Sequence, residues 1–206
     1  MVDCARRHYP VKGSKDNIQP PISDAETLYS QLSNNSDAYS VVPPNLLSQY
    51  EINFWYHGIS GNPPQLMWRS DVETNPFPTP PPGTHFFKIP TKTVHGVFNT
   101  PLNHVWHDIA PRILELLKAR GIKFSALQTV RFSIAEDGKD ETFGPIVVWI
   151  AVRPNTTNAA AVRDVTPDIL NILSDAQITG VVVEWYEAEV VRMLDVAPTS
   201  VEATPA

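Results

Sequence analysis

Apolar positions in the second half of the chain describe a strand–helix–strand unit. Pro145–Val152 contains no polar side chain, which predicts a central strand covered on both faces. A second apolar run, residues 181–186, predicts a partner strand, and we expect the two to be parallel with a right-handed crossover. Residues 158–176, between them, carry apolar side chains three and four positions apart, which predicts a helix with one apolar face: Val162, Val165, Ile169, Leu170 and Leu173.

Another helix and two more strands are predicted ahead of this unit. Residues 101–120 continue an apolar stripe, with Thr100 as the N-cap. Pro111 lies inside this pattern, so we expect the helix to kink or restart there. Residues 126–135 alternate between apolar and polar side chains, which is typical of a half-buried strand. A short strand is also predicted over residues 85–89.

An internal repeat indicates how these elements combine. Residues 107–122 align without gaps on 163–178, and six of the sixteen positions are identical: Asp108/Asp164, Pro111/Pro167, Ile113/Ile169, Leu114/Leu170, Leu117/Leu173 and Ile122/Ile178. Two similar helix-then-strand halves predict an α+β, ferredoxin-like β-α-β-β-α-β sandwich, with a four-stranded sheet and two helices on one face. Its strands are 85–89, 126–135, 145–152 and 180–190. In this layout the third strand is central and the second lies at an edge.

Proline content divides the chain into regions. Nine of the 20 prolines fall between residues 63 and 101, a stretch that we expect to be extended and mostly irregular. The α/β domain is expected over 101–192, with the Pro-rich segment 51–100 packing on it or leading into it. Residues 1–50 are predicted to be largely disordered or loosely helical, and residues 193–206 to form a disordered tail.

The sheet face away from the helices is the candidate interaction surface. We expect Val130, Phe132 and Ile134 to face the helices, so that the opposite face presents Arg131, Trp149, Glu184 and Tyr186. Such a mixture of aromatic and charged groups needs a cover or a partner, because large exposed apolar patches are rare on monomers. Three alternatives follow: the Pro-rich residues 50–90 fold over this face, another chain covers it, or it binds a ligand.

Charge and cysteine content narrow the range of partners. The net charge is −6, the pI is near 5.4 and no cluster of Lys or Arg occurs, so we expect neither nucleic acid nor a membrane as partner. No apolar run reaches the ~20 residues of a membrane span. The N-terminus lacks the apolar core of a secretory signal, and the single cysteine, Cys4, has no internal partner. We therefore expect a cytoplasmic protein.

Candidate catalytic and metal-binding residues are few. His104 and His107 lie three positions apart on the predicted helix 101–120, which makes them a weak candidate for a metal site. A polar flank of the helix explains the pair more simply, because no further ligand has matching spacing. The chain has no Gly-x-Ser-x-Gly elbow, no glycine-rich phosphate loop and no dinucleotide fingerprint. We therefore assign no catalytic residue and no cofactor.

Six short blocks carry a resemblance to known sequences: Tyr56–Gly58, Pro63–Leu66, Leu102–Trp106, Val130–Phe132, Gly144–Ile150 and Val183–Trp185. In these blocks the chain resembles a family of uncharacterised proteins from mushroom-forming (basidiomycete) fungi, over roughly residues 54–192. Some longer members carry a trypsin-like region that is absent here, so the resemblance implies no catalytic residue. The family has no known activity, and the resemblance supports only the domain boundary.

Two functions of different classes follow. The first is a non-catalytic α/β module that acts through protein contacts, with a protein partner or by self-association. The alternative is a small-molecule-binding domain or an enzyme that uses the open sheet face, with a pocket among Arg131, Trp149, Glu184 and Tyr186. A binder or enzyme needs a concave pocket with convergent polar groups, whereas a module needs a flat patch that a partner covers.

Overall fold

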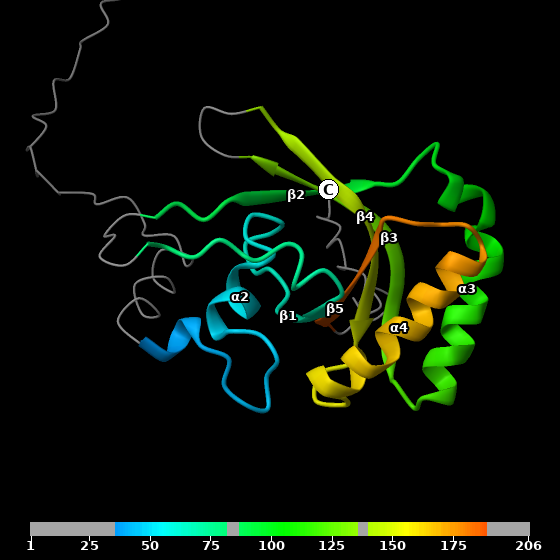
Figure 1. Ribbon diagram of the computed structural model, residues 1–206, viewed down its shortest axis with the longest axis horizontal. Coiled ribbons are helices and arrows are strands. Elements are labelled where there is room, and N and C mark those ends of the chain that lie inside the picture. The colour runs from blue at the N-terminus through cyan, green and yellow to red at the C-terminus, as the bar shows by residue number, and fades with distance from the viewer. Residues whose placement is uncertain (1–35, 82–86, 136–139, 189–206) are drawn as a thin grey trace, which may run out of the picture.

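A computed structural model describes residues 36–81, 87–135 and 140–188, an α+β arrangement around one open, mixed, five-stranded sheet (Figure 1). The described elements are the 3-10 helix η1 (Ser36–Tyr39), α2 (Gln49–Phe54), β1 (Leu66–Arg69), β2 (Thr91–Gly96), α3 (Pro101–Ala119), β3 (Phe124–Ala135), β4 (Thr142–Val152), α4 (Ala159–Asp175) and β5 (Val181–Glu187). The strands lie in the order β1-β5-β4-β3-β2. The predicted tail 193–206 and most of the predicted N-terminal region 1–50 lie outside the described residues. Within the described ranges, no helix is long and apolar enough to cross a membrane.

The strand–helix–strand unit predicted from the apolar runs is present. β4 and β5 are parallel neighbours, and α4 connects them along the chain. β4 is the middle strand of the five, and every residue from Val147 to Val152 is buried. An uninterrupted apolar run suits this position, because a central strand with both faces covered has no solvent side to present.

The ferredoxin-like arrangement that we predicted is not the one this sheet adopts. The sheet has five strands rather than four, and β3, expected at an edge, lies between β2 and β4. Strands β4 and β5 pair directly, because both are rich in apolar residues that require burial on both faces. The polar strand β2 takes an edge position instead. Of the predicted strand 85–89, the described residues 87–89 are irregular, and β2 begins at Thr91.

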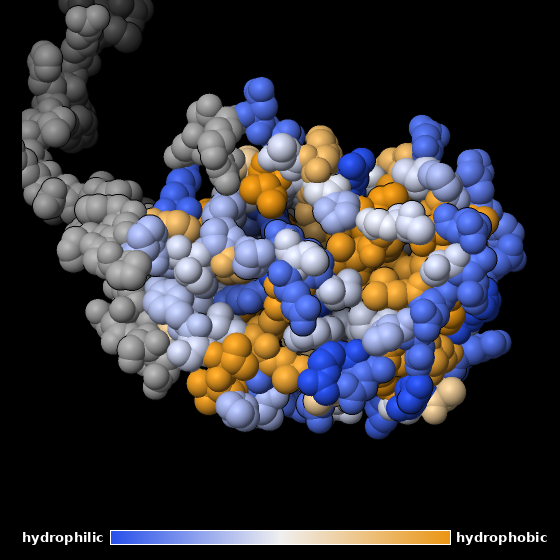
Figure 2. Space-filling model, viewed as in Figure 1, coloured by the Kyte–Doolittle hydropathy of each residue, from blue (hydrophilic) through white to orange (hydrophobic). Residues whose placement is uncertain are grey.

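Both long helices cover the same face of the sheet, as the internal repeat predicted (Figure 1). Buried side chains of the two helices and of the central strands form the core on this face: Leu102, Ile109, Ile113, Leu117, Val162, Val165, Ile169, Leu173, Val148, Ile150, Val183 and Trp185. Hydrophilic residues cover the outer side of α3, at the right edge of the space-filling view (Figure 2). Of the two alternatives expected at Pro111, a kink or a restart, the restart is not found: α3 continues through Pro111 to Ala119.

The other face of the sheet is covered by residues 47–77, here called the covering segment, which contains α2 and also supplies the edge strand β1 of the sheet. Its apolar residues (Leu47, Ile52, Trp55, Tyr56 and Leu66) form one core cluster with side chains of the sheet: Val130, Phe132, Val147, Trp149, Ala151, Val182 and Tyr186. Of the three alternatives for this face, the fold-over of the chain's own earlier residues is the arrangement found. Two of the five strands, β1 and β2, therefore precede residue 101, where the α/β domain was expected to begin.

The buried side chains of β3 lie on the face opposite to the one predicted. Val130 and Phe132 pack beneath the covering segment rather than against the helices, and Ile134 lies with Phe132 on the same side. Arg131, between Val130 and Phe132, is exposed. The alternation predicted for β3 is therefore present, but its two faces were assigned the wrong way round, because alternation alone does not say which face meets the helices.

Candidate functional site

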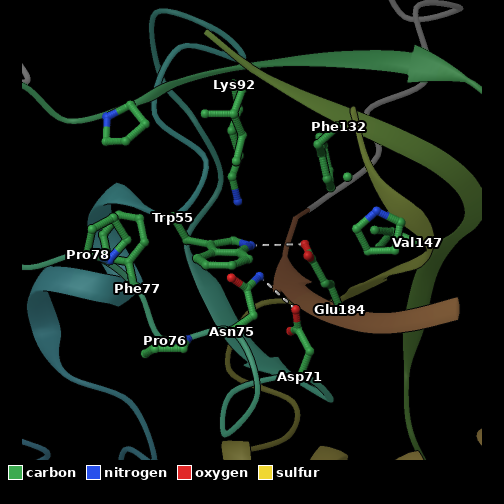
Figure 3. A pocket seen from close by; sticks show the side chains of 14 residues that line it. Trp55, Asp71, Asn75, Pro76, Phe77, Pro78, Lys92, Phe132, Val147 and Glu184 are labelled. Carbon is green, nitrogen blue, oxygen red and sulfur yellow. Dashed lines mark hydrogen bonds between the residues drawn. The ribbon is translucent and has the colours of Figure 1, made fainter. Parts of the chain in front are cut away.

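A cavity of about 240 Å³ lies between the covering segment and the sheet (Figure 3). Half of its lining residues are prolines or aromatic residues, and a few charged and polar groups lie among them. The lining residues that matter for its chemistry are Trp55, Asp71, Phe77, Lys92, Phe132 and Glu184. Sites for small molecules in proteins are typically concave and largely apolar, with a few well-placed polar groups. The cavity has that composition.

The tight turn that follows α2 is hydrogen-bonded to β2. This contact fixes the part of the cavity wall that Trp55 and Lys92 form. Trp55 directly follows α2, and two residues later the carbonyl of His57 accepts a hydrogen bond from the backbone N–H of Lys92 at 2.8 Å. Gly58 has a φ of +94°, in the region that favours glycine. A Cβ at this position would also clash with the Thr91 side chain. The glycine therefore permits the close approach that holds Lys92 beside Trp55.

Glu184 is the most deeply buried carboxyl in the cavity wall, with 2% of its surface exposed. Its Oε2 accepts hydrogen bonds from the Tyr56 hydroxyl at 2.7 Å and from the Trp55 indole nitrogen at 3.1 Å. Trp149 in turn donates its indole N–H to the Tyr56 oxygen at 2.9 Å. No group in the described part of the chain donates to Oε1. Burial raises the pKa of Glu184, although the charge of Lys92 and the two hydrogen bonds oppose the shift.

Lys92 enters the cavity from β2 and is only 6% exposed. Its amino nitrogen lies 3.2 Å from the centre of the Trp55 ring, in a cation–π contact (Figure 3). Among the described residues, no side chain or carbonyl accepts a hydrogen bond from this nitrogen. Burial lowers the pKa of Lys92 to about 8; the carboxyl of Glu184 opposes the shift and the charge of Arg69 adds to it.

A second buried cation, Arg69, lies beside the cavity and connects β1 to α2. Arg69 is fully buried; its Nε donates to Glu51 Oε1 at 2.7 Å and its Nη1 to Asp71 Oδ1 at 2.8 Å. The guanidinium also lies 4.1 Å from the centre of the Trp55 ring. Its Nη2 is buried and has no hydrogen-bond partner among the described residues. Asn75 donates to the other carboxylate oxygen of Asp71 at 2.9 Å, which orients that side chain at the cavity wall.

Three of the four residues predicted for the interaction face lie together, and the fourth lies apart. Trp149 and Tyr186 stack with ring centres 4.3 Å apart, and Glu184 reaches Trp149 through the Tyr56 hydroxyl. All three are buried beneath the covering segment rather than presented to a partner chain. Arg131 is exposed, and its side chain donates to the backbone carbonyl of Gly144 at 2.8 Å. It takes no part in the cavity.

A serine on β3, a histidine on β2 and a glutamate just before β4 meet without forming a catalytic triad. Ser133 Oγ donates to Glu141 Oε1 at 2.5 Å, and His95 Nε2 lies 2.7 Å from the same Oγ and 3.6 Å from the same Oε1. In a triad the imidazole lies between the other two groups and uses both of its ring nitrogens. Here one nitrogen faces both partners, so the three side chains act as a link between neighbouring strands.

The weak metal candidates remain without further ligands in the described part of the chain. His104 and His107 are exposed on α3, and His107 Nε2 lies 3.2 Å from the carboxylate of its neighbour Asp108. Among the described residues, no group of three His, Cys, Asp or Glu side chains is placed to hold a metal ion. Cys4 lies outside the described residues.

The sequence pointed to Glu184 but not to Lys92, Arg69 or Asp71. Glu184 is the single carboxylate inside the apolar run 181–186. Acidic side chains are rarely buried without a partner, so its position indicates a specific contact or role. Lys92 lies in a short polar stretch of sequence. An exposed lysine on an edge strand would have the same local sequence pattern, so the pattern does not reveal that Lys92 is buried. The covering segment buries it, and no local pattern reports that packing.

Comparison with known proteins brings no further residue role to this site. No protein-family model, curated protein or solved structure matches the chain. The resemblance of residues 54–192 to a fungal family therefore stays a prediction. What the cavity can bind depends on its own contacts, burial and charges.

Proposed function

We propose that the protein binds a small neutral molecule in the cavity between Lys92 and Glu184. One observation supports this most directly: Lys92 Nζ and Glu184 Oε1 belong to buried residues that line the same cavity, and neither has a hydrogen-bond partner among the described residues. Both atoms remain accessible from the cavity rather than sealed inside the protein. A ligand that accepts a hydrogen bond from Nζ and donates one to Oε1 can therefore replace water at both atoms.

The charges around the cavity favour a neutral ligand over an anion. The positive charge of Lys92 shares the cavity wall with the carboxyl of Glu184. The charges of Asp71 and Arg69 already pair with each other. An anionic ligand beside Lys92 would therefore be repelled by the carboxylate of Glu184, and this repulsion is strong in a site of low dielectric. A primary carboxamide supplies both the required acceptor and the required donor without a charge. Its apolar body would contact the rings that line the cavity, such as that of Phe77.

A thermal-shift titration with isobutyramide and benzamide tests this proposal. A ligand that binds only the folded protein raises the melting temperature with concentration. We expect both amides to do so, and isobutyrate, an anion of the same shape as isobutyramide, to have no effect. The variants Lys92→Met and Glu184→Gln should lose the response to the amides. Lys118→Met, at an exposed position on α3, should retain it.

A second measurement keeps the proposal testable if either cavity variant fails to fold. The indole N–H of Trp55 donates to Glu184 at the cavity wall, and its NMR resonance can be assigned by comparison with Trp55→Phe. We expect this resonance to shift when isobutyramide is added to the wild-type protein. A wild type that responds to neither amide, or that responds equally to isobutyrate, would show the proposal to be wrong.

A second candidate function, self-association through β2, is favoured by apolar side chains at this edge of the sheet. Val94 on β2 is 39% exposed, and Phe98 and Phe143 are 78% and 52% exposed. The Phe98 ring lies against Gly96, and the Phe143 ring centre is 5.0 Å from that of His95. An edge strand flanked by exposed apolar side chains is a surface on which a strand of a second copy can pair.

Size-exclusion chromatography with light scattering tests this second candidate. We expect the wild-type protein to dimerise with increasing concentration. Val94→Lys should shift the equilibrium to the monomer, because a lysine on an edge strand opposes strand pairing. Lys118→Met, on the helix face, is the matched control and should leave the dimer intact. A wild type that stays monomeric at every concentration would rule out this candidate.

A further inference from the structure

We infer that Lys92 is a reactive amine that forms an imine with a small neutral aldehyde held in the cavity. This inference rests on the proposed function and names a class of ligand for the same site. It starts from the geometry: a buried lysine lines a cavity, faces aromatic rings rather than an acceptor, and shares the cavity wall with the carboxyl of Glu184.

The surroundings of Lys92 leave its nitrogen available for chemistry. The side chain extends from β2 toward the Trp55 ring, and the centres of the Phe132 and Tyr56 rings lie 5.6 and 5.8 Å from Nζ (Figure 3). Aromatic faces stabilise the ammonium form but do not accept its protons in strong hydrogen bonds. When the proton leaves, the nitrogen lone pair is therefore not engaged by a described side chain and is free to attack a carbonyl carbon.

The protonation state of Lys92 favours the same chemistry. Burial lowers its pKa to about 8, the carboxyls of Glu184, Asp71 and Glu51 oppose the shift, and the guanidinium of Arg69 supports it. At pH 7, roughly one-tenth of such a lysine is free amine, against roughly one in 3,000 at the ordinary lysine pKa. The nucleophilic form is thus several hundred times more populated than that of an ordinary lysine.

The reaction balances without an oxidant or a reductant. The Lys92 nitrogen forms a bond to the carbonyl carbon, and the carbonyl π bond opens to give a carbinolamine. The C–O bond then breaks, and the oxygen leaves as water with the two protons that the amine gives up. Glu184, the more deeply buried of the two carboxyls on the cavity wall, can relay these protons, and burial raises its pKa. Hydrolysis of the imine is the same sequence in reverse.

The cavity lining indicates which aldehydes fit. The carboxyls of Glu184 and Asp71 line the cavity and disfavour an acidic 2-oxo compound, because a ligand carboxylate would lie among like charges. The walls include proline and aromatic rings, among them Phe77 and Phe132, which contact an apolar body. A volume of about 240 Å³ restricts that body to a short chain or a single ring. Small unbranched and aromatic aldehydes meet these conditions.

Reductive trapping on the full chain tests the inference. The protein is incubated at pH 7 with dilute butanal and sodium cyanoborohydride, which converts an imine to a stable secondary amine, and the labelled lysines are located by peptide mass spectrometry. We expect Lys92 to be labelled at least tenfold faster than the exposed Lys118 and Lys123 of the same molecule. Isobutyramide should slow the labelling of Lys92 alone. Unfolding in urea should abolish the preference, because burial of Lys92 is lost.

The variant Lys92→Arg provides the matched control, since it keeps a cation at the Trp55 ring but forms no stable imine. It should show only the slow labelling of exposed lysines. Equal labelling rates at Lys92 and Lys118 in the folded wild type would overturn the inference. If isobutyramide still raises the melting temperature in that case, ligand binding stands and only the imine is excluded. If the amide also has no effect, both the inference and the proposed function fail.

Discussion

The amino nitrogen of Lys92 lies 3.2 Å from the centre of the Trp55 indole ring. This contact joins the edge strand β2 to the covering segment. The same ring lies 4.1 Å from the guanidinium carbon of Arg69, and its N–H donates to Glu184. Trp55 therefore contacts both buried cations and the buried carboxyl. Its position links β1, β2 and β5 around the cavity, and the following predictions test that arrangement.

Replacing the central indole should destabilise the fold. Trp55→Phe keeps an aromatic face for Lys92 but removes the N–H that donates to Glu184. Because this hydrogen bond reaches a buried, ionisable acceptor, we expect a loss of about 1.5–3 kcal/mol in the free energy of unfolding. Urea denaturation measures it. Trp106→Phe, at a half-buried position on α3, should cost less, and an equal loss in both variants would contradict the linking role.

Removing the buried arginine should be more damaging than removing an exposed one. Arg69→Met leaves Glu51 and Asp71 beside each other without their cation, and we expect a loss of about 3–5 kcal/mol. Arg163→Met breaks the exposed pair with Asp164 and should cost no more than about 1 kcal/mol. Chemical denaturation of the two variants provides the comparison. Similar losses would show that the buried pair contributes little to the fold.

The lowered pKa of Lys92 should make stability rise with pH relative to a variant without the amine. Between the folded pKa of about 8 and the unfolded value of 10.5, the unfolded chain binds more protons at this position than the folded protein does. The free energy of unfolding of the wild type should therefore increase by about 2 kcal/mol relative to Lys92→Met between pH 7 and pH 9.5. Denaturation curves at several pH values measure this difference. A constant difference would mean that the pKa is not lowered.

Substitution at the turn beside β2 should disturb both stability and the cavity. Gly58→Ala places a Cβ against Thr91 at a residue with φ of +94°, and we expect a loss of about 2 kcal/mol. Gly61→Ala, in the same loop, has no atom within 4 Å of the added Cβ and should change stability by less than about 0.5 kcal/mol. Thermal or urea unfolding distinguishes the two. Equal effects would mean that the close approach of Gly58 to β2 is not required.

The sequence predicted well those elements in which the apolar pattern extends over several helical turns or over a long strand. The helix 101–120, the helix 158–176 and the apolar runs at 145–152 and 181–186 correspond to α3, α4, β4 and β5. Their periodicity depends on neighbours within one or two turns, so it is present in the sequence itself. The described part of the strand predicted over 85–89, residues 87–89, is irregular, and β2 begins after Pro90. A short apolar run is equally compatible with a strand and with an irregular segment.

The strand order and the site had no such local pattern. β2 and β3 are connected along the chain by α3 and pair with each other in the sheet. This pairing depends on which strands occupy the central positions of the sheet, and no local sequence pattern encodes it. Arg131 was predicted beside Trp149 because the two faces of β3 were assigned the wrong way round. Val130 and Phe132 share a face with Trp149, so Arg131, which lies between them, is on the opposite face. The charges at the cavity come from three separate stretches of the chain, and only Glu184 lies where its neighbours mark it as unusual.

By itself, the sequence determined the two amphipathic helices, the central apolar strands and the need to cover the second face of the sheet. Each of these follows from the spacing of apolar side chains along a short stretch of chain. Only the tertiary structure decided that residues 47–77 provide the cover and that Lys92 is buried beneath it. The hydrogen bond from Trp55 to Glu184 spans 129 positions. Desolvation and charge pairing arise from contacts between such distant residues, so folding creates the chemistry of the cavity.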